Sequence, residues 1–171
     1  MIPTSRSILL AAALALAACG EGTSTTASAP AEFTASTACV LDGMLLAEHP
    51  GPKAQILYDG AAEPDFFCDT VEMFNVYLQP EQLRAVRAVY VQDMGKADWD
   101  EPRGHWIDAH GAFYVVGGKR RGSMGPTIAS FSDREAAARF AGEYGGKVLP
   151  FSAVKPEMVV LDGGALHDQH M

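Results

Sequence analysis

The segment FFCDTVEMFNVYLQP (residues 66–80) predicts the end of a β-strand followed directly by an α-helix. Phe66-Phe67-Cys68 is a short apolar run of the kind that forms a buried strand. Asp69-Thr70-Val71-Glu72 is the pattern of a capping box, in which two side chains satisfy free backbone N–H groups at a helix start. Pro80 ends the helix, whose apolar residues share one face: Val71, Phe74 and Leu78.

Strands are predicted on both sides of this segment. Ala54 to Tyr58 (AQILY) is a short apolar run that precedes it, and Arg87 to Gln92 (RAVYVQ) follows it. The segment and its two flanking runs therefore predict one compact unit with the element order strand, strand, capped helix, strand.

The same order of elements returns farther along the chain. Residues 113–116 (FYVV) and 127–131 (TIASF) are predicted strands. Ser132-Asp133-Arg134-Glu135 predicts a second capping box, before a helix from Ala136 to Tyr144 that Gly145-Gly146 terminates. Val148 to Phe151 closes this unit as a strand. We therefore predict an α+β fold of two small ββαβ units packed together, at residues 37–104 and 105–152, followed by a tail at 153–171.

The N-terminus has the features of an export signal. Arg6 precedes an apolar run of ten residues, ILLAAALALA (8–17), which is too short to cross a bilayer as a permanent helix. Leu16-Ala17-Ala18-Cys19-Gly20 is similar to a lipobox, in which the cysteine thiol receives a lipid. We predict that residues 1–18 are cleaved and that Cys19 is lipidated, which ties the protein to a membrane surface on the periplasmic side. The alternative is an ordinary cleaved signal with a chance cysteine.

The residues after Cys19 predict a tether. The stretch EGTSTTASAPAEFTAS (21–36) is rich in Ser, Thr and Ala and contains a single large apolar residue, Phe33. Such a composition buries too little surface to offset the entropy of ordering, so we predict a flexible linker over residues 19–36.

Composition and motifs exclude several classes of function. The chain carries a formal net charge of −8, and Lys119-Arg120-Arg121 is its one basic cluster, so we expect no nucleic-acid partner. The sequence holds no Gly-x-Ser-x-Gly, no Walker loop and no Gly-x-Gly-x-x-Gly after a strand. A thiol enzyme is disfavoured because paired active-site cysteines are not evident. We therefore predict that the chain is not an enzyme.

Sulfur occurs in unusual places in the chain. Met73 sits on the first predicted helix and is typical of a core methionine. Three others lie in connections that contain glycine, where a methionine is exposed unless a ligand recruits it: Met44, Met94 and Met124. Thiolate and thioether are soft donors that favour Cu(I). The sequence therefore predicts a Cu(I) site, for which the candidate ligands are Cys39, Met44, Cys68, Met94, Met124 and His49.

Two other interpretations of these residues stay open. The methionines are alternatively scattered gap-filling side chains, and Cys39 and Cys68 form a disulfide in an oxidising compartment. The protein would then be a membrane-anchored interaction module that binds no metal. His105, next to Trp106, is the other candidate imidazole donor, and the alternative for each histidine is an ordinary surface position. The tail His167-Asp168-Gln169-His170-Met171 is a further possible copper ligand segment.

Several blocks of sequence resemble the NosL family, the copper-binding accessory lipoproteins of nitrous oxide reductase. The resemblance covers residues 39 to 151 in order. The blocks that carry it are DGM (42–44), EHPGPKAQ (48–55), FCDT (67–70), LQPE (78–81), YVQDM (90–94), WIDA (106–109), AFYVVG (112–117), GSMG (122–125), FS (131–132) and GGKV (145–148).

The resemblance implies a function as well as a fold. It implies two ββαβ units and one bound Cu(I), which the protein passes to nitrous oxide reductase or its maturation machinery for assembly of the copper–sulfide centre. It also implies that the Cys39-to-Met44 block and Asp93-Met94 belong to the copper-associated region. Members of the family often place a cysteine two residues before this methionine, where this chain has Asp42. Cys39 or Cys68 must then supply the thiolate, or Asp42 serves as a harder ligand.

Overall fold

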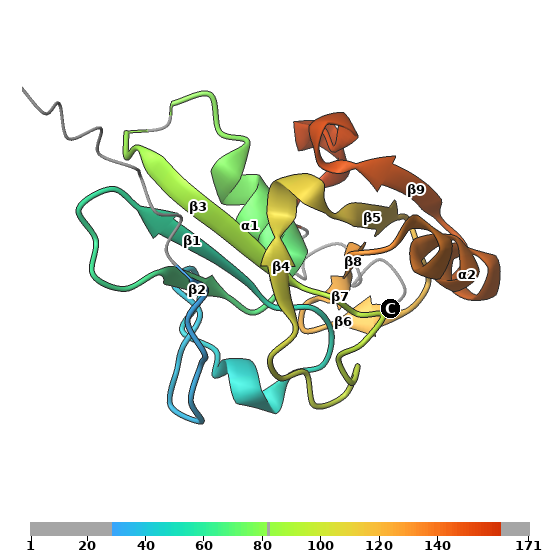
Figure 1. Ribbon diagram of the computed structural model, residues 1–171, viewed down its shortest axis with the longest axis horizontal. Helices are drawn as coiled ribbons and strands as arrows, with labels where there is room; N and C mark the ends of the chain where they lie inside the picture. The colour runs from blue at the N-terminus through green and yellow to red at the C-terminus, as the bar shows by residue number, and fades with distance from the viewer. Residues whose placement is uncertain (1–28, 82, 162–171) are drawn as a thin grey trace, which may run out of the picture.

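The computed structural model describes residues 29–81 and 83–161, which form two larger antiparallel sheets, each with one helix, and a two-stranded hairpin (Figure 1). The predicted signal peptide, the lipidation site Cys19 and residues 162–171 of the tail lie outside the described residues. Within the described residues, none of the helices is both long enough and apolar enough to cross a membrane.

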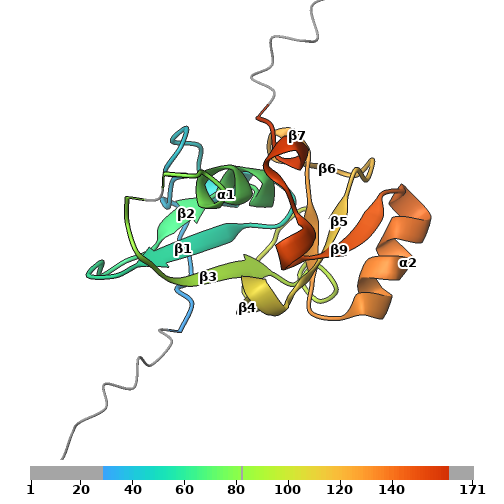
Figure 2. The same ribbon diagram turned by 90° about the horizontal axis from the view of Figure 1, so that it is seen from above.

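The first sheet has the strand order β2-β1-β3-β4. Its strands are β1 (Ala54–Tyr58), β2 (Asp65–Phe67), β3 (Val86–Gln92) and β4 (Trp106–Asp108). The helix α1 (Thr70–Tyr77) lies over one face of this sheet (Figure 2). The predicted capping box is present: Asp69 accepts a hydrogen bond from the Val71 N–H, and Glu72 accepts one from the Asp69 N–H. Met73 is fully buried in the core beneath α1, as predicted.

The second sheet has the order β8-β5-β9, and α2 (Arg134–Tyr144) packs on its outer side (Figure 2). Its strands are β5 (Phe113–Val116), β8 (Ala129–Phe131) and β9 (Lys147–Pro150). A separate hairpin, β6 (Arg121–Gly122) and β7 (Gly125–Pro126), precedes β8. Four short 3₁₀ helices complete the described elements: η1 (Leu46–Glu48), η2 (Ala109–Gly111), η3 (Phe151–Ala153) and η4 (Pro156–Met158).

The predicted two-unit α+β fold is therefore observed, with two differences in detail. Asp133 alone caps α2, because its side chain accepts from the Ala136 N–H, so the predicted box starting at Ser132 is wrong. Ser132 instead donates its hydroxyl to Asp93. The strand β4 lies in the 105–152 range but pairs with β3, so the first sheet takes its edge strand from that range.

The two sheets are joined where β3 ends beside β8. The Met94 N–H donates to the Ser130 carbonyl at 2.8 Å, and the Ser130 hydroxyl donates to the Gln92 carbonyl at 2.6 Å. Farther along, the Thr70 hydroxyl at the start of α1 bonds the Ile128 carbonyl. One apolar core is shared across this junction, since Phe74 of α1 meets Tyr114 edge to face and packs at a tilt against Phe151.

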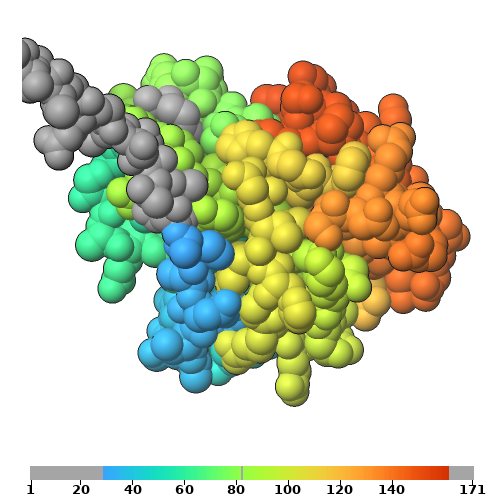
Figure 3. Space-filling view, viewed as in Figure 1, coloured from blue at the N-terminus to red at the C-terminus, as the bar shows by residue number. Residues whose placement is uncertain are grey.

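The first described residues lie against the domain, beside the segment around β4 (Figure 3). Ala31 exchanges two hydrogen bonds with the Gln55 side chain, each of 2.9 Å. Phe33 is only 6% exposed and meets Trp106 edge to face. The part of the predicted flexible linker after residue 30 is thus docked, because its one large apolar side chain has a place in the core.

Candidate metal centre

A hairpin at residues 38–45 carries the first cysteine. Ala38 and Leu45 form a β-bridge, and the Cys39 N–H donates to the Met44 carbonyl at 2.8 Å. Gly43 has φ of +78°, a backbone conformation that glycine adopts without steric cost. Asp42 accepts from the Met44 N–H at 2.9 Å through its side chain, which shapes the turn. Cys39 and Met44 are therefore held at facing positions of one tight turn.

The second cysteine lies between β2 and α1. Cys68 is fully buried, and its thiol donates to the Met44 carbonyl at 3.5 Å. The hairpin is fixed beside it because the Val40 N–H donates to the Phe66 carbonyl at 2.9 Å. Both cysteines are free thiols.

Cys39 and Cys68 form a candidate metal-binding group with Asp42. One donor atom from each of the three side chains lies within 4.8 Å of the others. Met44 is partly buried and packs against the apolar cluster that contains both cysteines. The structure therefore brings together four of the residues around the predicted site, two thiols, one thioether and one carboxylate.

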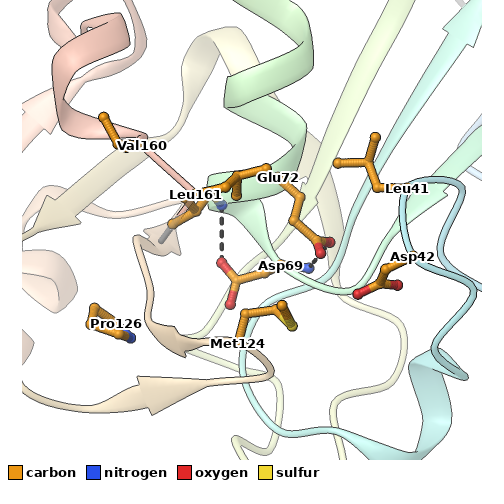
Figure 4. A pocket seen from close by; sticks show the side chains of 9 residues that line it. Leu41, Asp42, Asp69, Glu72, Met124, Pro126, Val160 and Leu161 are labelled. Atoms are coloured by element: carbon orange, nitrogen blue, oxygen red, sulfur yellow. Dashed lines mark hydrogen bonds between the residues drawn. The ribbon is translucent and has the colours of Figure 1, made fainter. Parts of the chain in front are cut away.

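The β6–β7 turn brings a further thioether to this place. The Ser123 hydroxyl donates to the Cys68 carbonyl at 3.0 Å, and the Thr127 hydroxyl donates to Asp69 at 2.5 Å. The residue after Ser123 is Met124, which is 50% exposed. It lines a pocket of about 340 Å³ together with Asp42 and other residues, shown in Figure 4.

Glu72 connects this pocket to the thiols. Its carboxyl Oε2 lies 3.3 Å from Cys39 Sγ, and the two groups share a hydrogen bond. A hydrogen bond from the Cys68 thiol lowers the pKa of Cys39 to about 6, whereas that hydrogen bond and burial raise the pKa of Cys68. Burial, with the nearby charge of Cys39, raises the pKa of Glu72 to about 8. At neutral pH the cysteine pair therefore holds one proton and one negative charge.

A buried ammonium group offsets this charge. Lys53 is fully buried, and its Nζ donates to the Cys68 carbonyl at 3.0 Å and to the Pro50 carbonyl at 3.1 Å. Burial lowers the pKa of Lys53 to about 8, and electrostatic interactions with the nearby Cys68 and Asp69 oppose that change. Burial likewise raises the pKa of Asp69 to about 6, although the Thr127 hydroxyl stabilises its carboxylate.

Two predicted ligands lie elsewhere. Met94 packs against a different apolar cluster, which contains Trp99, Phe131 and Ala137 of the second half of the chain. His49 follows the short helix η1 and is outside the group of donor atoms that the described residues bring together. Their assignment as ligands stays a prediction from the sequence.

Two residues at the site were not predicted from sequence. Glu72 was assigned only to the capping box, but it both caps α1 and contacts Cys39. Lys53 follows Pro50-Gly51-Pro52 in a short loop before β1, and nothing in that pattern predicts a fully buried ammonium group. The one available signal was Glu72, a carboxylate at the third position of a helix whose capping residue directly follows Cys68.

The sequence matches the NosL family over residues 30–159. It is 39% identical to the copper-binding lipoprotein NosL of Stutzerimonas stutzeri, with 94% of this chain and 87% of that protein covered. It is 43% identical to the protein of the same description from Achromobacter cycloclastes, with 91% and 82% covered. The crystal structure of the copper chaperone NosL from Shewanella denitrificans superposes with a TM-score of 0.72 at 37% identity, covering 77% of this chain and 98% of that one. With its two-sheet fold, its clustered thiols and these likenesses, the chain belongs to the NosL family.

Proposed function

We propose that this chain is a periplasm-facing, lipid-anchored protein that binds Cu(I) and delivers it for assembly of the copper–sulfide centre of nitrous oxide reductase. The observation that carries the proposal is the group of two thiols and a carboxylate whose donor atoms lie within 4.8 Å of one another. The names of the relatives support it, since they are described as copper-binding lipoproteins and as a copper chaperone.

The donors that the structure gathers suit Cu(I). Thiolate and thioether sulfur are soft ligands, and Cys39, Cys68 and Met44 offer them within one buried cluster. Met124 offers a further thioether at the pocket. Two or three such ligands hold the ion and leave a coordination position open. An acceptor then attacks at that position and takes the ion by stepwise ligand exchange.

This mode of action requires no catalysis. Transfer of an ion between sulfur ligands forms and breaks only metal–ligand bonds, so no covalent bond in the protein changes. Lys53 keeps a positive charge beside Cys68, which limits the cost of holding anionic sulfur in a buried place. We therefore assign the chain a carrier role in which nitrous oxide reductase or its maturation machinery is the acceptor.

An anaerobic Cu(I) titration tests the proposal directly. The processed chain is reduced, and its stoichiometry and affinity are measured by competition against a chromophoric chelator. We expect one Cu(I) per chain, with thiolate charge-transfer absorption in the ultraviolet. The alternative is the disulfide-stabilised interaction module, which the short distance between the two sulfur atoms favours. Such a chain would bind no Cu(I) when reduced, and its cysteines would resist labelling until they are reduced.

Two methionine variants locate the thioether. Met124→Leu keeps the size of the side chain and removes the sulfur, so we expect Cu(I) binding to weaken about tenfold or more, with little change in stability at a half-exposed position. Met94→Leu is the comparison variant, because the sequence predicts Met94 as a ligand whereas Met94 packs against the second apolar cluster. Unchanged Cu(I) binding in Met94→Leu would remove Met94 from the ligand set, and binding weakened as much as in Met124→Leu would confirm it as a ligand.

The anchor and the acceptor need tests in cells. Cys19→Ser removes the proposed lipid acceptor, so the chain should leave the membrane fraction or remain unprocessed. A strain that lacks this chain should accumulate nitrous oxide reductase without its copper–sulfide centre. A reductase with a complete centre in that strain, under limiting copper, would refute the assignment of the acceptor.

A further inference from the structure

The β6–β7 turn carries its two tip residues, Ser123 and Met124, to the edge of the metal centre. Gly122 pairs with Gly125 across the base of this turn. Met124 lines the pocket together with Asp42, which belongs to the three-residue donor group (Figure 4). The position of the Met124 thioether relative to the thiols therefore depends on how the turn is held.

The base of the turn is fixed from several sides. The Trp99 indole N–H donates to the Arg121 carbonyl at 3.1 Å. The backbone of Gly122 lies against the loop before β1, so closely that a Cβ added at Gly51 would be 2.9 Å from Gly122 Cα. After β7, the Thr127 hydroxyl donates to the carboxylate that caps α1 at 2.5 Å. Because backbone packed against backbone has no rotamers with which to adjust, the base has little freedom to move.

The tip is fastened through the hydroxyl of Ser123. This hydroxyl donates to the Cys68 carbonyl at 3.0 Å and lies 3.4 Å from a carboxylate oxygen of Asp69. Lys53 Nζ donates to the same Cys68 carbonyl at 3.0 Å. Loss of the Ser123 hydroxyl would therefore leave that carbonyl with a partner, so the fold should tolerate the loss.

The tip is also the part of the site that another molecule meets first. Met124 is 50% exposed, whereas Cys39 and Cys68 are at most 3% exposed. An incoming acceptor therefore reaches the thioether before it reaches either thiol. A bond that holds this thioether in place then controls both how firmly the ion is bound and how readily it leaves.

We propose that Ser123 is the positioning residue of the copper site. Its hydroxyl fixes the tip of the turn so that Met124 presents its sulfur to Cu(I), and release of this bond lets the tip swing away when an acceptor takes the ion. Ser123 itself gives no ligand to the metal. The inference rests on the proposed function, to which it adds the place where the site opens. Because the hydroxyl acts through Met124, its loss cannot weaken binding more than loss of the thioether does.

A double-mutant cycle on Cu(I) binding tests this role. In the reduced chain, Ser123→Ala should weaken Cu(I) binding about threefold to tenfold, the worth of one hydrogen bond, and should speed Cu(I) transfer to a chelator by a similar factor. In the Met124→Leu background the same substitution should change neither quantity. Equal binding by Ser123→Ala and the unmodified chain would overturn the proposal, and so would an effect that persists in Met124→Leu.

The matched control removes an equivalent bond elsewhere. The Ser130 hydroxyl donates to the Gln92 carbonyl at the junction of the two sheets, so Ser130→Ala loses the same pair of groups far along the chain from the turn. Ser130→Ala should leave Cu(I) affinity and the transfer rate unchanged. If Ser130→Ala weakens binding as much as Ser123→Ala does, the effect comes from general loss of stability, and the positioning role is refuted.

Methyl NMR of the metal-free chain gives a readout that needs no copper. The order parameter of the Met124 methyl group should fall in Ser123→Ala, because the tip has lost its fastening. That of Met94, which packs against the second apolar cluster, should stay the same. Equal Met124 order parameters in the two chains would overturn the role of Ser123 even if copper binds. An unmodified chain that binds no Cu(I) would instead refute the proposed function.

Discussion

Cu(I) binding should strengthen as the pH rises, because the free site holds a proton that the metal must displace. The pKa of Cys39 is lowered to about 6 by the hydrogen bond from Cys68, and the pKa of Cys68 is raised by that bond and by burial. Near pH 7 to 8 the pair therefore carries one proton, on Cys68. A Cu(I) ion held by both sulfur atoms requires both to be deprotonated.

The size of the effect follows from proton linkage. The free protein holds one more proton than the copper-bound protein, so the apparent Kd should fall about tenfold for each pH unit gained, or about 1.4 kcal/mol. Below the pKa of Cys39, about 6, a second proton must leave. The dependence should then steepen toward about a hundredfold per unit.

Competition titrations of the reduced chain at roughly pH 6.5, 7.5 and 8.5 measure this slope, with the chelator corrected for its own protonation. Cys68→Ser removes the thiol that holds the proton but supplies a hydroxyl that donates to Cys39 in its place, so its weaker binding should lose the slope near pH 7 to 8. Glu72→Gln is the control for a proton released by the carboxyl whose pKa is raised to about 8. A Kd that does not change with pH, or a slope that survives in Cys68→Ser, would refute the reasoning.

Three further predictions concern the fold and the ligand set. Gly122→Ala should destabilise the protein by about 1–3 kcal/mol in thermal unfolding, because the new Cβ would overlap the Asp69 carboxylate and lie 2.8 Å from Thr127 Cβ. As a control, Gly142→Ala in α2 has open space around it and should stabilise the protein by about 0.5–1 kcal/mol. Asp93→Asn should cost about 1–3 kcal/mol at neutral pH. Burial tends to raise the pKa of Asp93, but hydrogen bonds from Ser132 lower this pKa overall. The carboxylate therefore stabilises the fold above the pKa of the unfolded chain, and this stability is lost as the pH falls through the lower pKa of the folded protein. Denaturant titrations at several pH values measure this loss. Asp42→Cys should tighten Cu(I) binding about tenfold or more in reduced protein, because a soft thiolate replaces a hard oxygen donor; an unchanged Kd would place position 42 outside the metal site.

The larger elements were predictable because their signals are local. Asp69 and Glu72 mark the start of α1 within four residues of sequence, and Gly145 marks the end of α2. The short strands β4, β6 and β7 were not predicted, because the interactions that form such strands are not local. β4 has three residues, and it forms because Asp93 and Gln92 bind backbone carbonyls of the preceding turn and because β3 offers an open edge. No local pattern encodes such pairing.

The chemistry of the metal centre was also more predictable than its geometry. Soft sulfur in loops indicated copper, but Met94 and Met124 have the same sequence context, each beside a glycine. The difference between them is tertiary: the Ser123 hydroxyl donates to the Cys68 carbonyl, and the adjacent Met124 lines the same pocket as Asp42. The meeting of Cys39 with Cys68 likewise depends on one backbone hydrogen bond from Val40 to β2.

The two cysteines come from segments 29 positions apart, a hairpin and a strand end, and a turn from the other half of the molecule is fastened onto the second. An unfolded chain has the same thiols but does not hold them together. A metal ion that binds only the native state stabilises that state, by about 4 kcal/mol when the concentration of free ion is a thousand times Kd. Under the proposed function, copper loading would therefore select folded molecules: a misfolded chain would bind no ion, and a loaded chain would resist unfolding and proteolysis until it releases its copper.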